Sequence, residues 1–278
     1  MKLSLCFSPC PNDTFIFDAL VNKKIDTEGL EFDVRLEDVE TLNRLVLNDT
    51  PDVSKISYGV LPLIVPNYRV LEAGSALGRG VGPLLVAANE PEDANELVKS
   101  GIVALPGRNT TANLLYTLAY PETGKKIFMP FDQIENAVLD GAADAGVLIH
   151  EGRFTYEKKG LKKLMDLGAF WENQTGNPIP LGGIVMRRTL DHDLMKKVDR
   201  LIRKSIEYSW STYPILSAYV KEHAQEMDES IMRSHIDLYV NKYSSSLGPD
   251  GRSAIWTLLE TGMSFFPEPQ AGSYEVFI

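Results

Sequence analysis

The chain begins with a strict alternation of polar and apolar side chains. Over residues 2–8 the odd positions are leucine or phenylalanine and the even positions are polar or cysteine. This is the period-2 pattern of a strand with one buried face. Two prolines then interrupt the strand in Ser8-Pro-Cys-Pro-Asn-Asp-Thr14. Asn12 or Asp13 is a suitable N-cap for a helix over residues 14–21, so the pattern predicts a strand, a rigid turn and a capped helix.

The same arrangement recurs in the middle of the chain. An apolar strand over residues 101–105 runs into Pro106-Gly-Arg-Asn-Thr-Thr111, which precedes an apolar helix over residues 112–119. Thr110 and Thr111 are suitable residues for the start of that helix. A helix start leaves backbone N–H groups unpaired, so two such starts facing a cleft would offer donors and hydroxyls to one polar ligand.

A third apolar run, residues 145–149, ends on a single histidine, His150. A short continuous apolar run is typical of a buried parallel strand, and ligands of open α/β sheets bind at the carboxyl ends of such strands. Imidazole exchanges a proton near neutral pH, since its unperturbed pKa is ~6.5. His150 is therefore the best candidate for a general base, although its position alone also fits a core or surface histidine.

Two further segments carry candidate ligand contacts. A strand over residues 53–57 runs directly into Ser57, whose hydroxyl could face a cleft, and Lys55 could supply positive charge to a substrate anion or be an ordinary surface lysine. Residues 76–83 are rich in glycine but lack the spacing and the following helix of a dinucleotide site. We interpret them as a loop that permits close backbone approach, with Arg79 as a possible carboxylate donor.

The remaining periodicity predicts an α/β protein of two lobes with a cleft between them. Polar, proline-containing segments at residues 89–93 and 177–183 are the expected crossings. One lobe would comprise residues 1–90 and 184–278, and the smaller lobe residues 91–183. Further strands are expected at 30–36, 84–88, 127–130, 164–168 and 184–187, and helices at 38–47, 132–140, 169–174 and throughout the region after 191.

Composition narrows the possible partners. The net charge of −10 and the pI near 5.0 disfavour broad contact with nucleic acid or anionic lipid, while a small anion would need only a few local donors. No apolar run approaches the ~18 residues of a membrane span, and the first residues lack a signal-peptide core, so we expect a cytoplasmic protein.

The cysteine and histidine residues do not predict a metal site. The two cysteines, Cys6 and Cys10, are expected to be free thiols, and the four histidines are widely separated in sequence. His150-Glu151 lacks the second histidine of the zinc-protease helix motif.

Five motifs in order resemble the 1,4-dihydroxy-6-naphthoate synthase family, whose members act in the futalosine route to menaquinone. They are Ser8-Pro-Cys-Pro-Asn-Asp-Thr-Phe-Ile-Phe17, Leu36-Glu-Asp-Val-Glu-Thr-Leu-Asn-Arg44, Ala76-Leu-Gly-Arg-Gly-Val-Gly-Pro83, Pro106-Gly-Arg-Asn-Thr-Thr-Ala112 and Ile149-His-Glu-Gly-Arg-Phe-Thr-Tyr156. The resemblance implies a periplasmic-binding-protein-like (type II) fold and a small-molecule substrate, cyclic dehypoxanthine futalosine. It implies a lyase that releases 1,4-dihydroxy-6-naphthoate and a dihydroxyacetone fragment without a metal or redox cofactor.

The resemblance also assigns site residues. The family's proton acceptor falls on His150, and its substrate contacts fall on Lys55, Ile56 and Ser57 and on Thr110 and Thr111. We add Asn12, Asp13 and Arg79 as expected substrate contacts from the capped turn and the glycine-rich loop. Gly152 stands where some relatives have serine, which leaves the histidine assignment intact.

Three other functions compete with this lyase. A chorismate dehydratase of the same pathway would share the two-lobed fold, and a non-enzymatic solute-binding protein would share it without catalysis. The Ser8–Thr14 motif and His150 favour the lyase over the dehydratase, and the absence of a signal segment disfavours the solute-binding protein. A thiol enzyme using Cys10 is the weakest alternative, because no neighbour known from the sequence would lower the pKa of its thiol.

Overall fold

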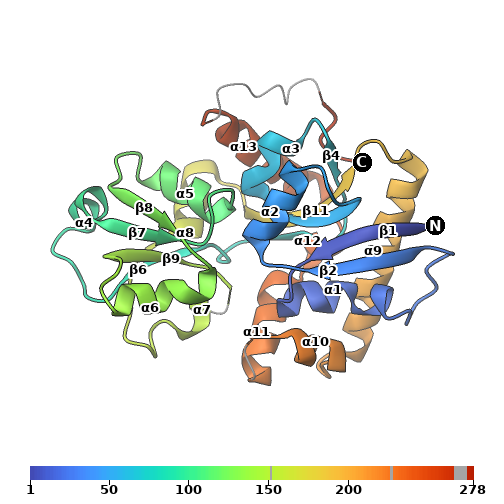
Figure 1. Cartoon of the computed structure of the whole chain (residues 1–278), viewed down its shortest axis with the longest axis horizontal. Coiled ribbons are helices and arrows are strands. Elements are labelled where there is room, and N and C mark those ends of the chain that lie inside the picture. Colours follow the sequence, from blue (N-terminus) through green and yellow to red (C-terminus); the bar gives the residue numbers. More distant parts are fainter. Residues whose placement is uncertain (151, 226–227, 266–273) are drawn as a thin grey trace. The chain divides into compact units, whose positions relative to one another are not determined.

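The computed structural model describes residues 1–150, 152–225, 228–265 and 274–278. The chain forms two compact units, one of Met1–Gly78 with Pro180–Ile278 and the other of Arg79–Ile179. Figure 1 shows that each unit has its own sheet with helices against it. The two-lobed α/β organisation expected from the hydrophobic pattern is confirmed.

The first unit is built on a sheet of order β2-β1-β3-β11-β4, with β5 also paired to β11. β1 is parallel to β2 and β3, whereas β11 is antiparallel to β3 and β4. The strands are β1 (Lys2–Phe7), β2 (Glu31–Leu36), β3 (Val53–Ser57), β4 (Tyr68–Val70), β5 (Ala76–Gly78) and β11 (Ile179–Arg187). The helices are α1 (Pro11–Val21), α2 (Val39–Leu47), α3 (Leu61–Ile64), α9 (His192–Thr212), α10 (Ala218–His223), α11 (Glu229–Tyr239), α12 (Lys242–Ser245) and α13 (Gly248–Met263), with a 3-10 turn, η1 (Tyr58–Val60).

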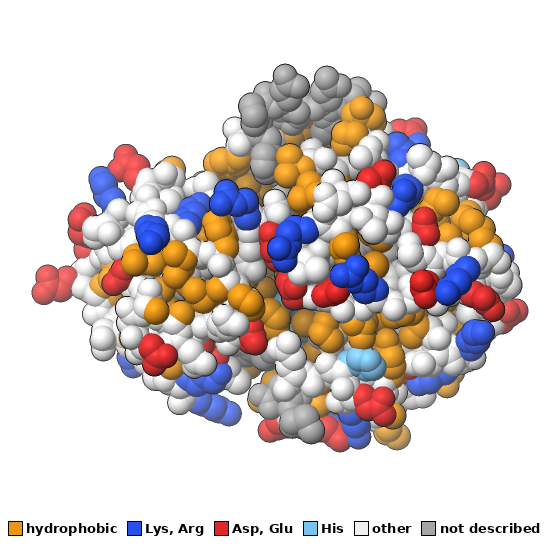
Figure 2. Space-filling view, viewed as in Figure 1, with side chains coloured by type: hydrophobic (Ala, Val, Ile, Leu, Met, Phe, Trp, Pro, Cys, Tyr) orange, Lys and Arg blue, Asp and Glu red, His pale blue; other side chains and the backbone are white. Residues whose placement is uncertain are grey.

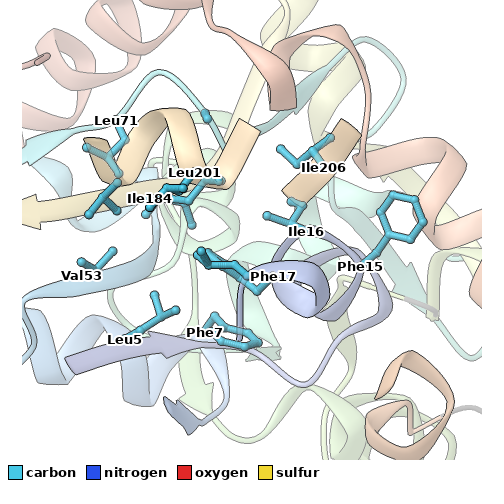
Figure 3. Close-up of a cluster of buried hydrophobic side chains, with 14 of the residues drawn as sticks. Leu5, Phe7, Phe15, Ile16, Phe17, Val53, Leu71, Ile184, Leu201 and Ile206 are labelled. Carbon is cyan, nitrogen blue, oxygen red and sulfur yellow. The ribbon is translucent and has the colours of Figure 1, made fainter. Parts of the chain in front are cut away.

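The core of the first unit lies around α1, which packs against α9, α10 and α11. The apolar face predicted for β1 is buried there, and the rings of Phe7 and Phe17 stack with centroids 4.4 Å apart (Figure 3). Burial of each such side chain contributes about 1.5–3 kcal/mol. This packing fixes the end of β1 and the start of α1 against the sheet.

The second unit is built on a sheet of order β10-β6-β9-β7-β8. The strands are β6 (Leu84–Ala87), β7 (Ile102–Leu105), β8 (Lys125–Phe128), β9 (Ala145–Leu148) and β10 (Lys162–Asp166). The helices are α4 (Ala94–Ser100), α5 (Thr111–Ala119), α6 (Ile134–Leu139), α7 (Gly152–Thr155) and α8 (Leu167–Thr175), with a 3-10 turn, η2 (Phe131–Gln133). β9 is parallel to β7 but antiparallel to β6, so the strand before His150 is parallel on one side only.

The first crossing lies after Gly78 and not at residues 89–93 as expected from the polar run. The reason is strand pairing, since β6 is hydrogen-bonded to β9 and β10 and therefore belongs to the smaller unit. The returning crossing, at Ile179, lies four residues before the expected boundary at 183. The glycine-rich loop does permit close backbone approach, because a Cβ on Gly82 would lie 2.2 Å from the Cα of Gly168.

The surface carries charges of both signs. On the face shown in Figure 2, lysine and arginine side chains alternate with aspartate and glutamate side chains. Within the described ranges, no helix is both long enough and apolar enough to cross a membrane.

Candidate functional site

The turn after β1 delivers a buried carboxylate to the start of α1. The helix begins at Pro11, because a proline is well suited to the first helical position, where its missing N–H costs nothing. The expected cap at Asn12 or Asp13 is therefore wrong: the N-cap is Cys10, which makes no side-chain capping bond. Asp13 instead points back toward the strand end, where its Oδ2 accepts hydrogen bonds from the Ser8 hydroxyl (2.7 Å) and the Ser8 backbone N–H (3.3 Å).

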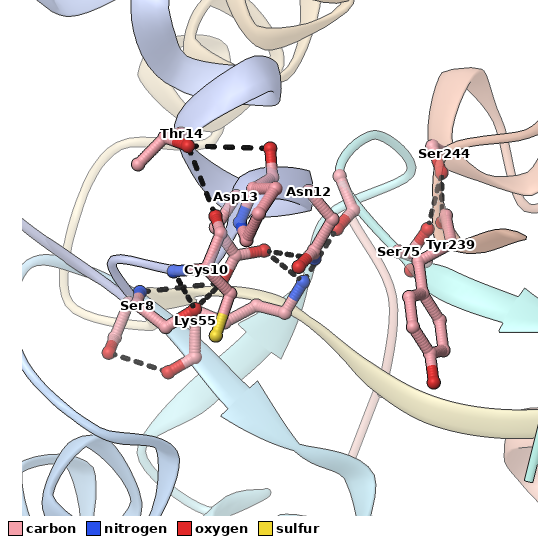
Figure 4. Close-up of polar contacts among 12 residues, drawn as sticks. Ser8, Cys10, Asn12, Asp13, Thr14, Lys55, Ser75, Tyr239 and Ser244 are labelled. Atoms are coloured by element: carbon pink, nitrogen blue, oxygen red, sulfur yellow. Dashed lines mark hydrogen bonds and ion pairs between the residues drawn. The ribbon is translucent and has the colours of Figure 1, made fainter. Parts of the chain in front are cut away.

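Lys55 of β3 completes this cluster (Figure 4). Its Nζ lies 2.8 Å from Asp13 Oδ1 and 3.3 Å from the carbonyl oxygen of Gly74. The residue is only 5% exposed, so it is not the ordinary surface lysine that the sequence also allowed. An ammonium is excluded from a protein interior unless it is paired and hydrogen-bonded, and Asp13 supplies that partner. Asn12 also donates to Asp13 Oδ1, at 2.8 Å.

Ser57 is held by Asn43, which is not among the predicted site residues. The amide of Asn43, on α2, donates from Nδ2 to Ser57 Oγ at 3.2 Å and accepts from the Ser57 backbone N–H at 2.9 Å. Asn43 is fully buried between Leu42 and Val46 in an otherwise apolar helix face. A polar residue on the apolar face of a helix needs a buried hydrogen-bond partner. The position of Asn43 on such a face is the sequence signal that could have identified it as a site residue.

Ile56 is one of the predicted substrate contacts. Its side chain is fully buried, so a ligand could reach only its main chain. Across the sheet it is opposite Gly183, where an added Cβ would lie 2.2 Å from the hydroxyl oxygen of Tyr58. Tyr58, the residue that follows β3, shares a 2.6 Å hydrogen bond with Ser75.

In the second unit, Thr110 and Thr111 begin α5 as predicted. Thr110 is the N-cap: its hydroxyl accepts from the backbone N–H of Asn113 at 3.2 Å and donates to the carbonyl of Gly107 at 2.9 Å. Thr110 and Thr111 are each 3% exposed. The cap therefore fixes the turn rigidly in front of the helix, which is the geometry expected of a polar binding loop.

His150 lies two residues after the end of β9 in the same unit. Its backbone is in the left-handed region (φ 55°), which histidine adopts more readily than most residues. The imidazole is half-buried, with the Phe131 ring edge-on at a centroid distance of 4.7 Å. Glu151, the next residue of the motif, lies outside the described residues. Left-handed backbone at a strand end is a form of strain that proteins retain at functional sites.

Arg153 anchors the segment that carries His150. Its guanidinium donates to the carbonyls of Gly80 (2.8 Å) and Gly82 and lies 3.1 Å from Asp166. Arg79 of the same loop is mostly exposed and donates to the carbonyl of Gly176 at 2.7 Å. Arg79 is thus hydrogen-bonded to the residue that follows α8. Its role as a donor to a substrate carboxylate stays a prediction.

Arg153 provides a first test of this anchoring. We expect Arg153→Met to lower kcat by ~10- to 100-fold, because a displacement of about 1 Å at a catalytic group can cost 10²-fold. Arg153→Lys would give an intermediate loss, since lysine keeps the charge but not the forked donor geometry. Steady-state kinetics checks this. Arg187→Met is the control, because Arg187 likewise donates to two adjacent carbonyls, those of Asp49 and Thr50, in the other unit.

Among the residues that the structure describes, neither the cysteines nor the acidic side chains form a second candidate centre. Cys6 and Cys10 are buried and not disulfide-bonded, and burial raises the pKa of the Cys6 thiol. Across the described parts of the chain, no three histidine, cysteine, aspartate or glutamate side chains are grouped as metal ligands.

Comparison with known proteins identifies the family. Residues 3–263 match the family model described as menaquinone biosynthesis. The chain belongs to the menaquinone biosynthesis family. Two curated members of similar sequence are named 1,4-dihydroxy-6-naphthoate synthase. The Streptomyces coelicolor protein is 42% identical over 262 residues (92% of this chain, 91% of the relative), and the Thermus thermophilus protein is 42% identical over 253 residues (91% of each).

Solved structures place this family member in a wider fold group. A crystal structure of an Archaeoglobus fulgidus protein superposes with a TM-score of 0.88 at 35% identity, covering 95% of this chain and 97% of that one. A Candida albicans protein described as having the generic periplasmic binding protein fold gives 0.71 at 12% identity, covering 96% and 92%. The aliphatic sulphonate binding protein of Escherichia coli gives 0.63 at 12%, covering 96% and 89%. The expected periplasmic-binding-protein-like fold is confirmed.

Proposed function

We propose that this chain is a lyase that converts cyclic dehypoxanthine futalosine to 1,4-dihydroxy-6-naphthoate, with release of a dihydroxyacetone fragment, in menaquinone biosynthesis. The observation that carries the proposal is the 42% identity, over nine-tenths of both chains, to two proteins named 1,4-dihydroxy-6-naphthoate synthase. The five motifs that first suggested this family contain Asp13, Asn43, Thr110 and His150, each of which makes a specific contact in the structure.

His150 is the proposed general base. Breaking a carbon–carbon and a carbon–oxygen bond in a sugar-derived ring beside an aromatic system begins with removal of a proton. It also requires donors for the oxyanion that develops. Imidazole is suited to the first task, and its position at the end of β9 is where ligands of α/β sheets bind. The reaction proposed here uses no metal or redox cofactor.

Further polar residues are proposed to bind the substrate. Ser57 and Lys55 would act as donors, and Thr110 and Thr111 as orienting groups, since the Thr110 hydroxyl already donates to the Gly107 carbonyl. Ser57 is pre-positioned by Asn43, and Thr110 by its capping bond, before any substrate arrives. Donors held in advance stabilise developing charge without reorganising, which is the largest contribution in many enzymes.

The decisive experiment incubates the purified protein with cyclic dehypoxanthine futalosine and follows 1,4-dihydroxy-6-naphthoate by mass. We expect the naphthoate and one equivalent of dihydroxyacetone. A parallel incubation with chorismate tests the dehydratase alternative. Binding of the substrate without any product would support a solute-binding protein and refute the lyase.

A further inference from the structure

The Lys55 ammonium has three N–H groups and two of them have acceptors. Asp13 Oδ1 takes one at 2.8 Å, and the Gly74 carbonyl takes one at 3.3 Å. Among the residues that the structure describes, the third N–H has no acceptor. An N–H group that is nearly buried and makes no hydrogen bond costs free energy. We therefore expect the third N–H to donate to an oxygen atom of a bound ligand.

Asp13 is closed to direct ligand contact. It is only 1% exposed, and its two carboxylate oxygens accept from Ser8, Asn12 and Lys55 (Figure 4). Both oxygens are thereby engaged inside the protein. Any effect of Asp13 on a substrate must therefore pass through another residue, and Lys55 is the one of these three that carries a charge.

We propose that Asp13 is a positioning residue that fixes and neutralises the Lys55 ammonium, so that Lys55 donates to an uncharged hydroxyl or carbonyl oxygen of the substrate. The proposal rests on the function proposed above and adds a chemical class for the group that Lys55 binds. It replaces the expectation that Asp13 itself contacts the substrate.

The charge of the Lys55–Asp13 pair determines which class of substrate oxygen Lys55 can bind. The ammonium and the Asp13 carboxylate together are neutral and lie in a buried position. A second carboxylate on Lys55 would give this position a net negative charge, which is unfavourable away from water. A neutral oxygen accepts the third N–H without that penalty.

Pre-organisation of the Lys55 side chain explains why an aspartate is needed. Lysine has a long flexible side chain, and its immobilisation at the moment of binding would weaken the binding. Asp13 makes this ordering part of the folded protein. Ser8 supports it from behind, since both its hydroxyl and its backbone N–H donate to the far carboxylate oxygen.

The test is Asp13→Asn, which keeps the shape and removes the charge. We expect KM for cyclic dehypoxanthine futalosine to rise by ~10- to 100-fold with kcat nearly unchanged, because the donor is no longer fixed in position. We also expect millimolar sulfate to become a competitive inhibitor, because the ammonium has lost its counter-charge. A purely structural role for Asp13 would produce neither effect.

The matched control is Asp18→Asn on the same helix. Asp18 is similarly buried and pairs with Lys24 at 2.6 Å, so the variant loses an ion pair of the same kind and leaves Lys55 intact. We expect it to lower the melting temperature without changing KM or creating inhibition by sulfate. Ser8→Ala serves if Asp13→Asn does not fold, and its KM should rise several-fold.

The outcomes separate the two proposals. If the wild-type protein makes no naphthoate, the proposed function fails and this inference falls with it. If the wild type is active but Asp13→Asn, or Ser8→Ala in its place, leaves KM unchanged, only the positioning role is refuted. A fall in KM for Asp13→Asn would show that Asp13 competes with a substrate anion for Lys55, which also overturns the inference.

Discussion

His150→Asn is expected to lower kcat by ~10²–10⁴-fold while the protein stays folded, because the substitution removes the proposed general base. Asparagine is chosen since His150 has a left-handed backbone (φ 55°), which asparagine tolerates with little strain. Alanine at this position would add a backbone cost to the chemical one. The measurement is steady-state turnover of cyclic dehypoxanthine futalosine, with circular dichroism and the melting temperature as checks of folding.

The control for this prediction is His223→Asn, which removes a histidine from α10 of the other unit. The His223 ring is 2.9 Å from the carbonyl oxygen of Tyr219 and has no proposed role in catalysis. We expect its kcat to match that of the wild type. Turnover by His150→Asn at the wild-type rate would rule out the histidine as the base.

Lys55→Met is expected to decrease the free energy of unfolding by about 3–5 kcal/mol, because the Asp13 carboxylate is left buried without its counter-charge. Chemical denaturation of variant and wild type measures this difference. Lys24→Met is the comparison: its ammonium also pairs with a buried aspartate, but its side chain is 32% exposed, so water can replace it. We expect a loss of ~1 kcal/mol or less there.

A double variant shows whether the loss comes from an unpaired charge. Lys55→Met with Asp13→Asn removes both charges, and replacing both partners of a buried pair is much less costly than removing one. We expect the double variant to regain much of the stability lost in Lys55→Met. Additive losses in the two single variants would show that the ion pair is not the origin of the effect.

Much of the fold followed from local patterns in the sequence. The alternation at the start of the chain and the apolar run before His150 both became strands, at β1 and β9. Thr110 caps α5 as expected, since a threonine hydroxyl satisfies the orphan N–H groups of a helix start whatever surrounds it. The family motifs were equally local, and the assignment drawn from them agrees with the curated relatives.

Predictions that depended on distant partners were less successful. The first crossing between units was predicted about twelve residues too late, because the polar run at 89–93 resembles a linker. In the structure β6 pairs with β9 and β10 and so belongs to the smaller unit. Asp13 was interpreted as a helix cap, and its true partner, Lys55, is 42 residues away in sequence. Asn43 was overlooked because its partner, Ser57, lies on another element.

The sequence by itself determined the α/β class and many of the longer elements, because periodicity, capping and motif spacing are local properties. Only the tertiary structure decided that Lys55 is buried, that Asp13 is its counter-charge and that Arg153 anchors the His150 segment. The physical reason is that burial and charge pairing depend on which segments meet in the folded chain. A lysine in a strand has the same sequence signature whether its ammonium faces water or a carboxylate.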